Sequence, residues 1–263
     1  MAEQTTTLLP DDGEERPRPG ASLRAAARQS RPLLIAIGVA IALLLAFGIW
    51  TAVSPHSGTA DGRSTERGSG SPSAEAGPRR VVDGVPVGYA HTQPGAVAAA
   101  VHYQLARSRP TYITDASLRH TVLGHVMAAS SLQTQRASDD ANADAAMKAL
   151  GLTPAGQGPQ GARWLQHSAP LGVQVAFYSG QAVTVNVWMA ESAGVVGDPA
   201  TVLPPSGSYT TYVLTLVWER GDWRIASIAT RPGPVPAASS NQRPSSQQDW
   251  QQSGRFAAPP PFS

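Results

Sequence analysis

A run of 21 residues without a charged side chain, 33–53, constrains this chain more than any other feature. A helix of that length measures about 31 Å, which is close to the thickness of the hydrocarbon layer of a bilayer. A cleaved secretory signal usually has a shorter apolar core and a small-residue cleavage site, which Thr51-Ala52-Val53 matches poorly. We therefore predict a retained transmembrane helix over 31–53, in preference to a cleaved signal or a buried soluble helix.

Basic residues on the two sides of this run predict its orientation. Five arginines precede it, and no Lys or Arg follows it until Arg63. Because basic flanks of a spanning helix tend to stay in the cytoplasm, we predict a single-pass protein of the cell membrane. Its N-terminus would be cytoplasmic, and the later part of the chain would be extracytoplasmic.

Composition divides the rest of the chain into one folded region and three segments without core-building periodicity. We predict a disordered cytoplasmic tail over 1–30, a flexible linker over 54–80 and a disordered Pro/Ser/Gln-rich tail over 233–263. The net charge of +2 and the scattered basic residues argue against direct binding of nucleic acid. The absence of cysteine excludes disulfides, thiolate metal sites and a thiol nucleophile.

The region 81–232 begins with helical patterns. Apolar residues recur at helical spacing in 92–110, 114–130 and 134–152. Thr92 is expected to cap the first helix, Thr114 or Asp115 the second, and Gly151 to end the third. Pro110 is expected to stop the first helix, and the Ala-rich third helix to be the more exposed one.

After a Gly/Pro-rich loop at 153–161 the apolar period changes to two residues, as in strands. The stretches 171–180, 181–191 and 209–228 predict four strands, with turns at Ser179-Gly180 and Arg220-Gly221-Asp222. In the first strand Val173, Val175 and Phe177 fall on one face. A sheet with one apolar face needs a cover, so we predict an α+β roll of three helices and a four-stranded antiparallel sheet.

The helix and strand order resembles a known superfamily. An Ala-rich helix followed by strands that end in VLTLVWERGDWRIASI, 213–228, resembles nuclear-transport-factor-2-like domains. With a short cytoplasmic tail and one anchor, the chain resembles the bitopic scaffold subunits of conjugation and type IV secretion systems, including TcpC-type proteins of GC-rich Gram-positive bacteria. The stretch 82–106 is similar to membrane proteins encoded with conjugation ATPases. TcpC-type proteins often carry two such domains, whereas one is expected here.

Residues that could carry chemistry are few. Enzymes of this superfamily place a carboxylate between sheet and helices, but the alternation here predicts an interior of Val, Leu, Met and Trp. Asp139, Asp140 and Asp144 are expected on a solvated helix face. Five histidines lack ligand spacing and are expected as separate surface or half-buried residues: His91, His102, His120, His125 and His167. We therefore predict no catalytic residue, no metal ligand and no cofactor, and a protein that is not an enzyme.

Four residues are candidate partner contacts: Arg220 and Asp222 on an exposed turn, and Trp250 and Phe256 as docking anchors in the tail. The predicted function is a non-enzymatic scaffold of a conjugative or type IV-like machine, with other membrane subunits or further copies of the chain as partners. The alternative is a membrane-tethered module that binds a small ligand or envelope component in the concavity of the roll. A hydrolase or isomerase would need a buried acid or histidine facing that pocket.

Overall fold

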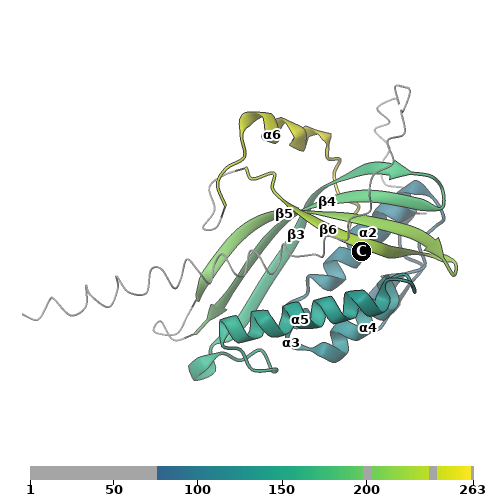
Figure 1. Cartoon of the computed structure of the whole chain (residues 1–263). Coiled ribbons are helices and arrows are strands. Elements are labelled where there is room, and N and C mark those ends of the chain that lie inside the picture. The colour runs from purple at the N-terminus through teal and green to yellow at the C-terminus, as the bar shows by residue number, and fades with distance from the viewer. Residues whose placement is uncertain (1–75, 198–202, 237–241, 262–263) are drawn as a thin grey trace, which may run out of the picture. The chain divides into compact units, whose positions relative to one another are not determined.

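The computed structural model describes residues 76–197, 203–236 and 242–261. The predicted transmembrane helix 31–53, the predicted tail 1–30 and most of the predicted linker lie outside these residues. Among the described residues no helix is long and apolar enough to cross a membrane. The fold is α+β, with helices followed by a four-stranded antiparallel sheet, as the sequence predicted (Figure 1).

Within the described residues the elements follow one another as a hairpin, four α-helices, a 3-10 helix, the sheet and two further short helices. They are β1 (Arg80–Val82), β2 (Val85–Val87), α2 (Gln93–Arg107), α3 (Pro110–Thr114), α4 (Ala116–Val126), α5 (Leu132–Leu150), η2 (Pro159–Gly161), β3 (Arg163–Tyr178), β4 (Ala182–Val196), β5 (Leu203–Glu219), β6 (Asp222–Pro232), α6 (Gln247–Gln251) and η3 (Gln252–Arg255). Helices α2 to α5 lie on one side of the curved sheet, and α6 lies on the other (Figure 1).

Three of the helix ends predicted from the sequence are confirmed, and the predicted stop at Pro110 is wrong. The Thr92 hydroxyl accepts a hydrogen bond from the Gly95 amide, and the Asp115 carboxylate accepts one from the Leu118 amide. Gly151 ends α5 in the left-handed conformation. Pro110, however, is the first residue of α3, a helix that the sequence analysis did not predict, and α2 already ends at Arg107.

The sheet is a meander with the strand order β3-β4-β5-β6, and both predicted turns are present. At the β5–β6 turn Arg220 and Gly221 have φ of 55° and 79°. Two consecutive positive φ values match the right-handed twist of a hairpin, which explains why a glycine occupies the second position. The first strand starts at Arg163, eight residues before the predicted start at 171.

The main core joins the inner face of the sheet to α2. Val183, Val185, Val187 and Met189 of β4 are fully buried, and they pack in one cluster with alanines of α2. A second, smaller apolar cluster forms farther along the strands from Leu150, Leu152, Ala162, Trp164, Ala193 and Val195. The inner face is therefore apolar in two separate regions.

The prediction that Phe177 lies on the same face of the sheet as Val173 and Val175 is wrong. The pairing of β3 with β4 shifts by one residue between Val175 and Phe177. Because side chains alternate along a strand, this bulge turns Phe177 outward, and it is 54% exposed.

Residues 242–257, within the predicted disordered tail 233–263, pack on the outer face of the sheet and along the edge of β3. The Trp188 ring lies 5.8 Å from the Trp250 ring and 5.7 Å from the Phe256 ring, centroid to centroid. Val173 and Ala257 exchange two backbone hydrogen bonds at the edge of β3. A Cβ added to Gly172 would lie 2.7 Å from the Phe256 Cβ, so only glycine permits this approach. The tail thus covers Trp188, which is 9% exposed.

A single carboxylate fastens the N-terminal hairpin and α2 to the sheet. Asp222 accepts hydrogen bonds from the amides of Gly88 and Tyr89 and from the Tyr103 hydroxyl, at 2.8, 3.0 and 3.2 Å. It is 3% exposed, which contradicts the prediction that it lies on an exposed turn. These donors come from parts of the chain about 120 to 130 residues away from it in sequence.

We predict that Asp222→Ala lowers the free energy of unfolding by about 2–4 kcal/mol, because it leaves several buried donors without an acceptor. Urea denaturation of the full-length chain, followed by circular dichroism, measures this change. Asp144→Ala, which removes an exposed acid from α5, should change the value by less than about 0.5 kcal/mol. Equal effects of the two substitutions would contradict the fastening role of Asp222.

Candidate functional site

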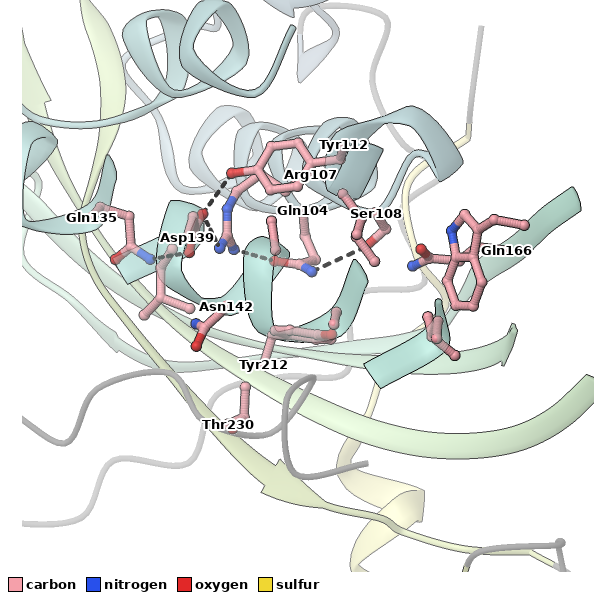
Figure 2. A pocket seen from close by; sticks show the side chains of 16 residues that line it. Gln104, Arg107, Ser108, Tyr112, Gln135, Asp139, Asn142, Gln166, Tyr212 and Thr230 are labelled. Carbon is pink, nitrogen blue, oxygen red and sulfur yellow. Dashed lines mark hydrogen bonds and ion pairs between the residues drawn. The ribbon is translucent and has the colours of Figure 1, made fainter. Parts of the chain in front are cut away.

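A cavity of about 110 Å³ lies between the helices and the inner face of the sheet (Figure 2). It separates the two apolar clusters, and its wall contains residues of both, such as Ile228 and Leu150. The polar side chains that line it are Gln104, Arg107, Ser108, Tyr112, Gln135, Asp139, Asn142, Gln166, Tyr212 and Thr230. A cavity between the two layers of a domain, with several polar side chains in its wall, is a candidate binding site.

The helical wall of the cavity centres on a buried ion pair. Arg107 at the end of α2 lies 3.0 Å from the Asp139 carboxylate of α5. That carboxylate also accepts hydrogen bonds from the Tyr112 hydroxyl at 2.6 Å and from the Gln135 amide at 2.8 Å. Burial lowers the pKa of Arg107, but the charge of Asp139 outweighs this effect, so the pKa of Arg107 is raised and its guanidinium stays charged.

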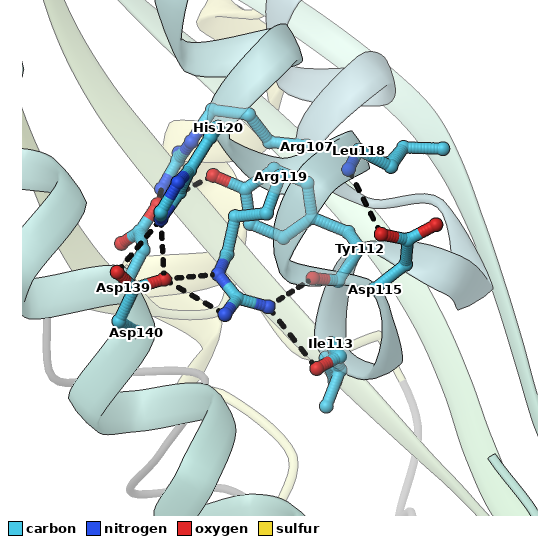
Figure 3. Close-up of polar contacts among 9 residues, drawn as sticks. All are labelled: Arg107, Tyr112, Ile113, Asp115, Leu118, Arg119, His120, Asp139 and Asp140. Atoms are coloured by element: carbon cyan, nitrogen blue, oxygen red, sulfur yellow. Dashed lines mark hydrogen bonds and ion pairs between the residues drawn. The ribbon is translucent and has the colours of Figure 1, made fainter. Parts of the chain in front are cut away.

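The sequence predicted that Asp139 and Asp140 lie on a solvated helix face. Asp139 is instead buried, and Asp140 is only partly exposed to solvent. The Arg119 guanidinium bonds the Asp140 carboxylate and the carbonyl oxygens of Tyr112 and Ile113, while His120 bonds Asp140 from the same helix (Figure 3). These bonds hold the pKa of the Asp140 carboxyl below its usual value against a raising effect of burial. The network fixes α3, α4 and α5 to one another behind the helical wall.

The sheet contributes a polar belt between the two apolar clusters. Ser168 of β3 pairs with Glu191 of β4, which pairs with Ser208 of β5, and Gln166 precedes Ser168 on the same face. Glu191 interrupts the inner row of β4, which is otherwise Val, Met and Ala. It is 4% exposed, so the prediction of an interior without a carboxylate is wrong.

Glu191 has one oxygen in use and one without a partner. The Tyr212 hydroxyl donates a hydrogen bond of 2.8 Å to Oε1, whereas Oε2 is buried and has no partner within the described part of the chain. Burial raises the pKa of the Glu191 carboxyl, although the nearby hydroxyl groups of Tyr212 and Thr210 oppose this shift. Burial and the nearby Glu191 also raise the pKa of Tyr212 well above its ordinary value.

Buried polar atoms without partners concentrate at this site. Six such side-chain atoms occur among the described residues, and five belong to the cavity wall or the belt: Arg107 Nε, Trp164 Nε1, Gln166 Oε1, Ser168 Oγ and Glu191 Oε2. An unpaired buried polar atom costs about 1–3 kcal/mol, so native structures rarely leave several together. Three of these atoms belong to residues that line the cavity, Arg107, Trp164 and Gln166, whereas Ser168 and Glu191 do not line it.

The four candidate partner contacts do not converge on this cavity. Arg220 lies at the β5–β6 turn with its side chain 78% exposed, next to Glu219. Trp250 and Phe256 lie on the outer face around Trp188, where Trp250 is 38% exposed. Asp222 is buried, as described above.

Sequence reasoning missed the cavity residues, although one signal was available. The alternation of β4, continued two residues past Met189, places Glu191 on the inner face. The role of Asp139 had no such signal, because its partner Arg107 lies on another helix.

The histidines lie apart from one another. His91 stacks on Trp218, His120 and His125 each bond an aspartate, and His102 bonds the Tyr89 hydroxyl. Among the described residues no group of three or more His, Cys, Asp or Glu could hold a metal ion.

Comparisons with known proteins give one family and one weak structural likeness. The model of a family described as "Domain of unknown function (DUF8175)" matches residues 69–246. No curated protein matches the chain. The crystal structure of the intermembrane space region of the chloroplast protein ARC6 has a TM-score of 0.36 and 16% identity. That alignment covers 54% of this chain and 98% of the other.

We predict that Glu191→Gln stabilises the apo protein at neutral pH. A carboxyl whose pKa is raised on folding binds its proton more tightly in the native state, so wild-type stability falls as pH rises from the unfolded pKa toward the folded one. The glutamine has no such loss, and its carbonyl oxygen can still accept the Tyr212 hydrogen bond. Unfolding curves at a series of pH values should show a gain for the variant that grows across this window and vanishes below it. A variant less stable than wild type at neutral pH would contradict the assignment.

Proposed function

This chain belongs to the DUF8175 family, and from the geometry of its own cavity we propose that it is a non-enzymatic module that binds a small polar ligand inside the roll. The observation that carries this proposal is the group of three unpartnered buried polar atoms on residues that line one cavity, Arg107 Nε, Trp164 Nε1 and Gln166 Oε1. Structural polar networks normally pair such atoms within the chain, whereas a binding site leaves them for its ligand.

Binding is favoured over catalysis by the state of the two acids. Both oxygens of Asp139 already accept hydrogen bonds, from Tyr112, Arg107 and Gln135. A general base needs a free oxygen within reach of the substrate proton. Glu191 has an oxygen without a partner, but that oxygen is fully buried, and no histidine or lysine of the described residues lines the cavity to act as a second proton-transfer group.

We also propose, from the sequence, that the apolar run 31–53 tethers this module to the cell membrane and that the fold is of the nuclear-transport-factor-2-like kind. A helical layer that covers the concave side of a four-stranded antiparallel sheet supports this second point. In that arrangement the cavity would face the extracytoplasmic space.

A second candidate function is the scaffold role in a conjugative or type IV-like machine. It is favoured by the outer side of β3, an edge strand with exposed Leu165, Leu171 and Phe177. Edge strands with exposed apolar side chains are ready sites for pairing with another chain. Membrane subunits or further copies of the chain would then dock beside the tail residue Ala257, which already pairs with this edge.

Filling the cavity tests the binding function. Ala146 of α5 is buried and lines the cavity, whereas its neighbour Ala145 is exposed. We predict that Ala146→Leu abolishes retention of small molecules by the chain purified from its own cells, as read by native mass spectrometry. The fold should survive because the added methyl groups enter existing space. Ala145→Leu should retain the wild-type adducts, and identical spectra for both variants would contradict the proposal.

Crosslinking tests the scaffold candidate. A photoreactive residue at Phe177 should capture membrane subunits or a second copy in intact cells, because this side chain projects from the edge strand. The same residue at Lys148, which is exposed on α5 on the other side of the sheet, should give much less product. Equal capture at both positions would argue against docking at β3.

A further inference from the structure

We infer that a second site, a cleft on the outer face of the sheet, binds a sugar or polyol that carries a phosphate monoester. This outer cleft is lined by the outward side chains of the strands and by the C-terminal segment that contains α6, on the side of the sheet away from α2 to α5 (Figure 1). The inference does not depend on the function proposed for the inner cavity.

The outer cleft has the size of a small-molecule site. Its volume is about 580 Å³, and sites for small ligands typically measure about 300–1,000 Å³. Its floor is the outer face of the sheet, and its walls come from residues 232–235 and 242–256. The cleft can therefore hold a ligand with several polar groups.

Hydrogen bonds fix the two walls of the outer cleft. The side-chain amide of Gln242 bonds both the backbone amide and the carbonyl oxygen of Tyr209 on β5. The Val235 amide donates to the Ser245 hydroxyl oxygen at 2.9 Å, and the Ser245 amide donates to the Val235 carbonyl oxygen at 3.0 Å. The walls are thus fastened to the sheet and to each other, which makes the cleft a built part of the fold.

Three arginines from three different segments line the outer cleft. They are Arg231 near the end of β6, Arg243 before α6 and Arg255 at the end of η3. All three residues are exposed, so a ligand can reach them from solvent. None of the five ion pairs among the described residues includes any of them. Three unpaired cations around one cleft attract an anion to it.

The charges of the cleft leave a clear excess. Asp249 is the only acid among the described residues that line it, and its Oδ2 accepts a hydrogen bond of 2.7 Å from the Ser246 hydroxyl. Three arginines and one aspartate give the lining a formal charge of +2. A ligand group with two negative charges would balance it.

A phosphate monoester matches this charge. It carries about −1.5 to −2 at neutral pH and offers three terminal oxygens. Arginine binds such oxygens through paired N–H donors. A carboxylate has a single charge and two oxygens, so it would leave one positive charge uncompensated. A hydroxyl group brings no charge at all.

The rest of the lining favours a polyol over a nucleobase. The Asn186 amide on the floor donates a hydrogen bond of 3.0 Å to the Gln174 side-chain oxygen, and Thr211 lies beside them on β5. Amides and hydroxyls of this kind donate and accept, as the hydroxyls of a sugar do. Phe256 is the one aromatic residue among the described lining, and its ring packs against Trp188. No free aromatic face is therefore offered to a base.

Calorimetric titration of the full-length chain in an uncharged detergent, at neutral pH, tests this inference with glycerol 3-phosphate, glycerate and glycerol. Glycerol 3-phosphate should bind, glycerate should bind at least about tenfold more weakly, and glycerol should give no measurable heat. Added salt should weaken the binding of glycerol 3-phosphate, because the arginines are exposed to solvent.

Matched variants locate the site. Arg231→Gln, Arg243→Gln and Arg255→Gln should each weaken glycerol 3-phosphate about tenfold, and their exposed positions should leave the circular dichroism spectrum unchanged. Arg163→Gln removes an exposed arginine at the start of β3, outside the cleft, and should bind as wild type does. Ala146→Leu, which fills the inner cavity, should also bind as wild type does.

A competition arm separates two sources of the same chemistry. Phosphatidic acid carries a phosphate monoester on a glycerol unit, as glycerol 3-phosphate does. Displacement of glycerol 3-phosphate by phosphatidic acid added to the detergent micelles would support the inference with a lipid headgroup as the ligand. A lack of displacement would support it with a soluble ligand.

Four results would overturn the inference. Glycerate could bind as tightly as glycerol 3-phosphate, or none of the three cleft variants could weaken binding. Arg163→Gln could weaken binding as much as they do, which would indicate general attraction to basic residues. Glycerol 3-phosphate could fail to bind wild type, or Ala146→Leu could abolish its binding, which would place it in the inner cavity. Failure of the outer site leaves the cavity-filling comparison of Ala146→Leu with Ala145→Leu to decide the proposed function separately.

Discussion

The alternation of side chains along long strands is the constraint on which this structure depends. Strands β3, β4 and β5 have 16, 15 and 17 residues, whereas α2, the helix in the main core, has 15. At about 3.3 Å per strand residue and 1.5 Å per helical residue, the sheet extends roughly twice as far as that helix. The inner face must therefore be covered in part by other material, and the polar belt lies beyond the main core.

The same alternation explains why Glu191 is buried. Val185, Val187 and Met189 must face inward to form the core, and the pleat then turns residue 191 to the same side. Only a bulge could turn it outward, as happens to Phe177 on β3. On β4 the register with β5 shifts after Ala193, which is too late to change the direction of Glu191.

Local signals made much of this fold predictable. Some features depend only on residues that are close together in sequence, so a short segment is enough to predict them. They are the caps at Thr92 and Asp115, the end of α5 at Gly151 and the β5–β6 turn. Features that join distant segments were not predictable in this way. The Arg107–Asp139 pair joins two helices, Asp222 binds donors far away in the chain, and the Trp188 ring receives a tail whose composition suggested disorder. The single anchor 31–53 remains a prediction.

The cost of the polar belt is the strongest reason to assign it a role. A valine at 191 would continue the apolar row of β4, and a smaller polar residue would avoid a buried acid, so the fold itself does not require Glu191. Arg107 and Asp139, by contrast, form a buried ion pair and would contribute a rigid wall without any ligand, although Arg107 Nε has no partner among the described residues. The unpartnered atoms thus lie mainly on the sheet side and the partnered ones mainly on the helical side.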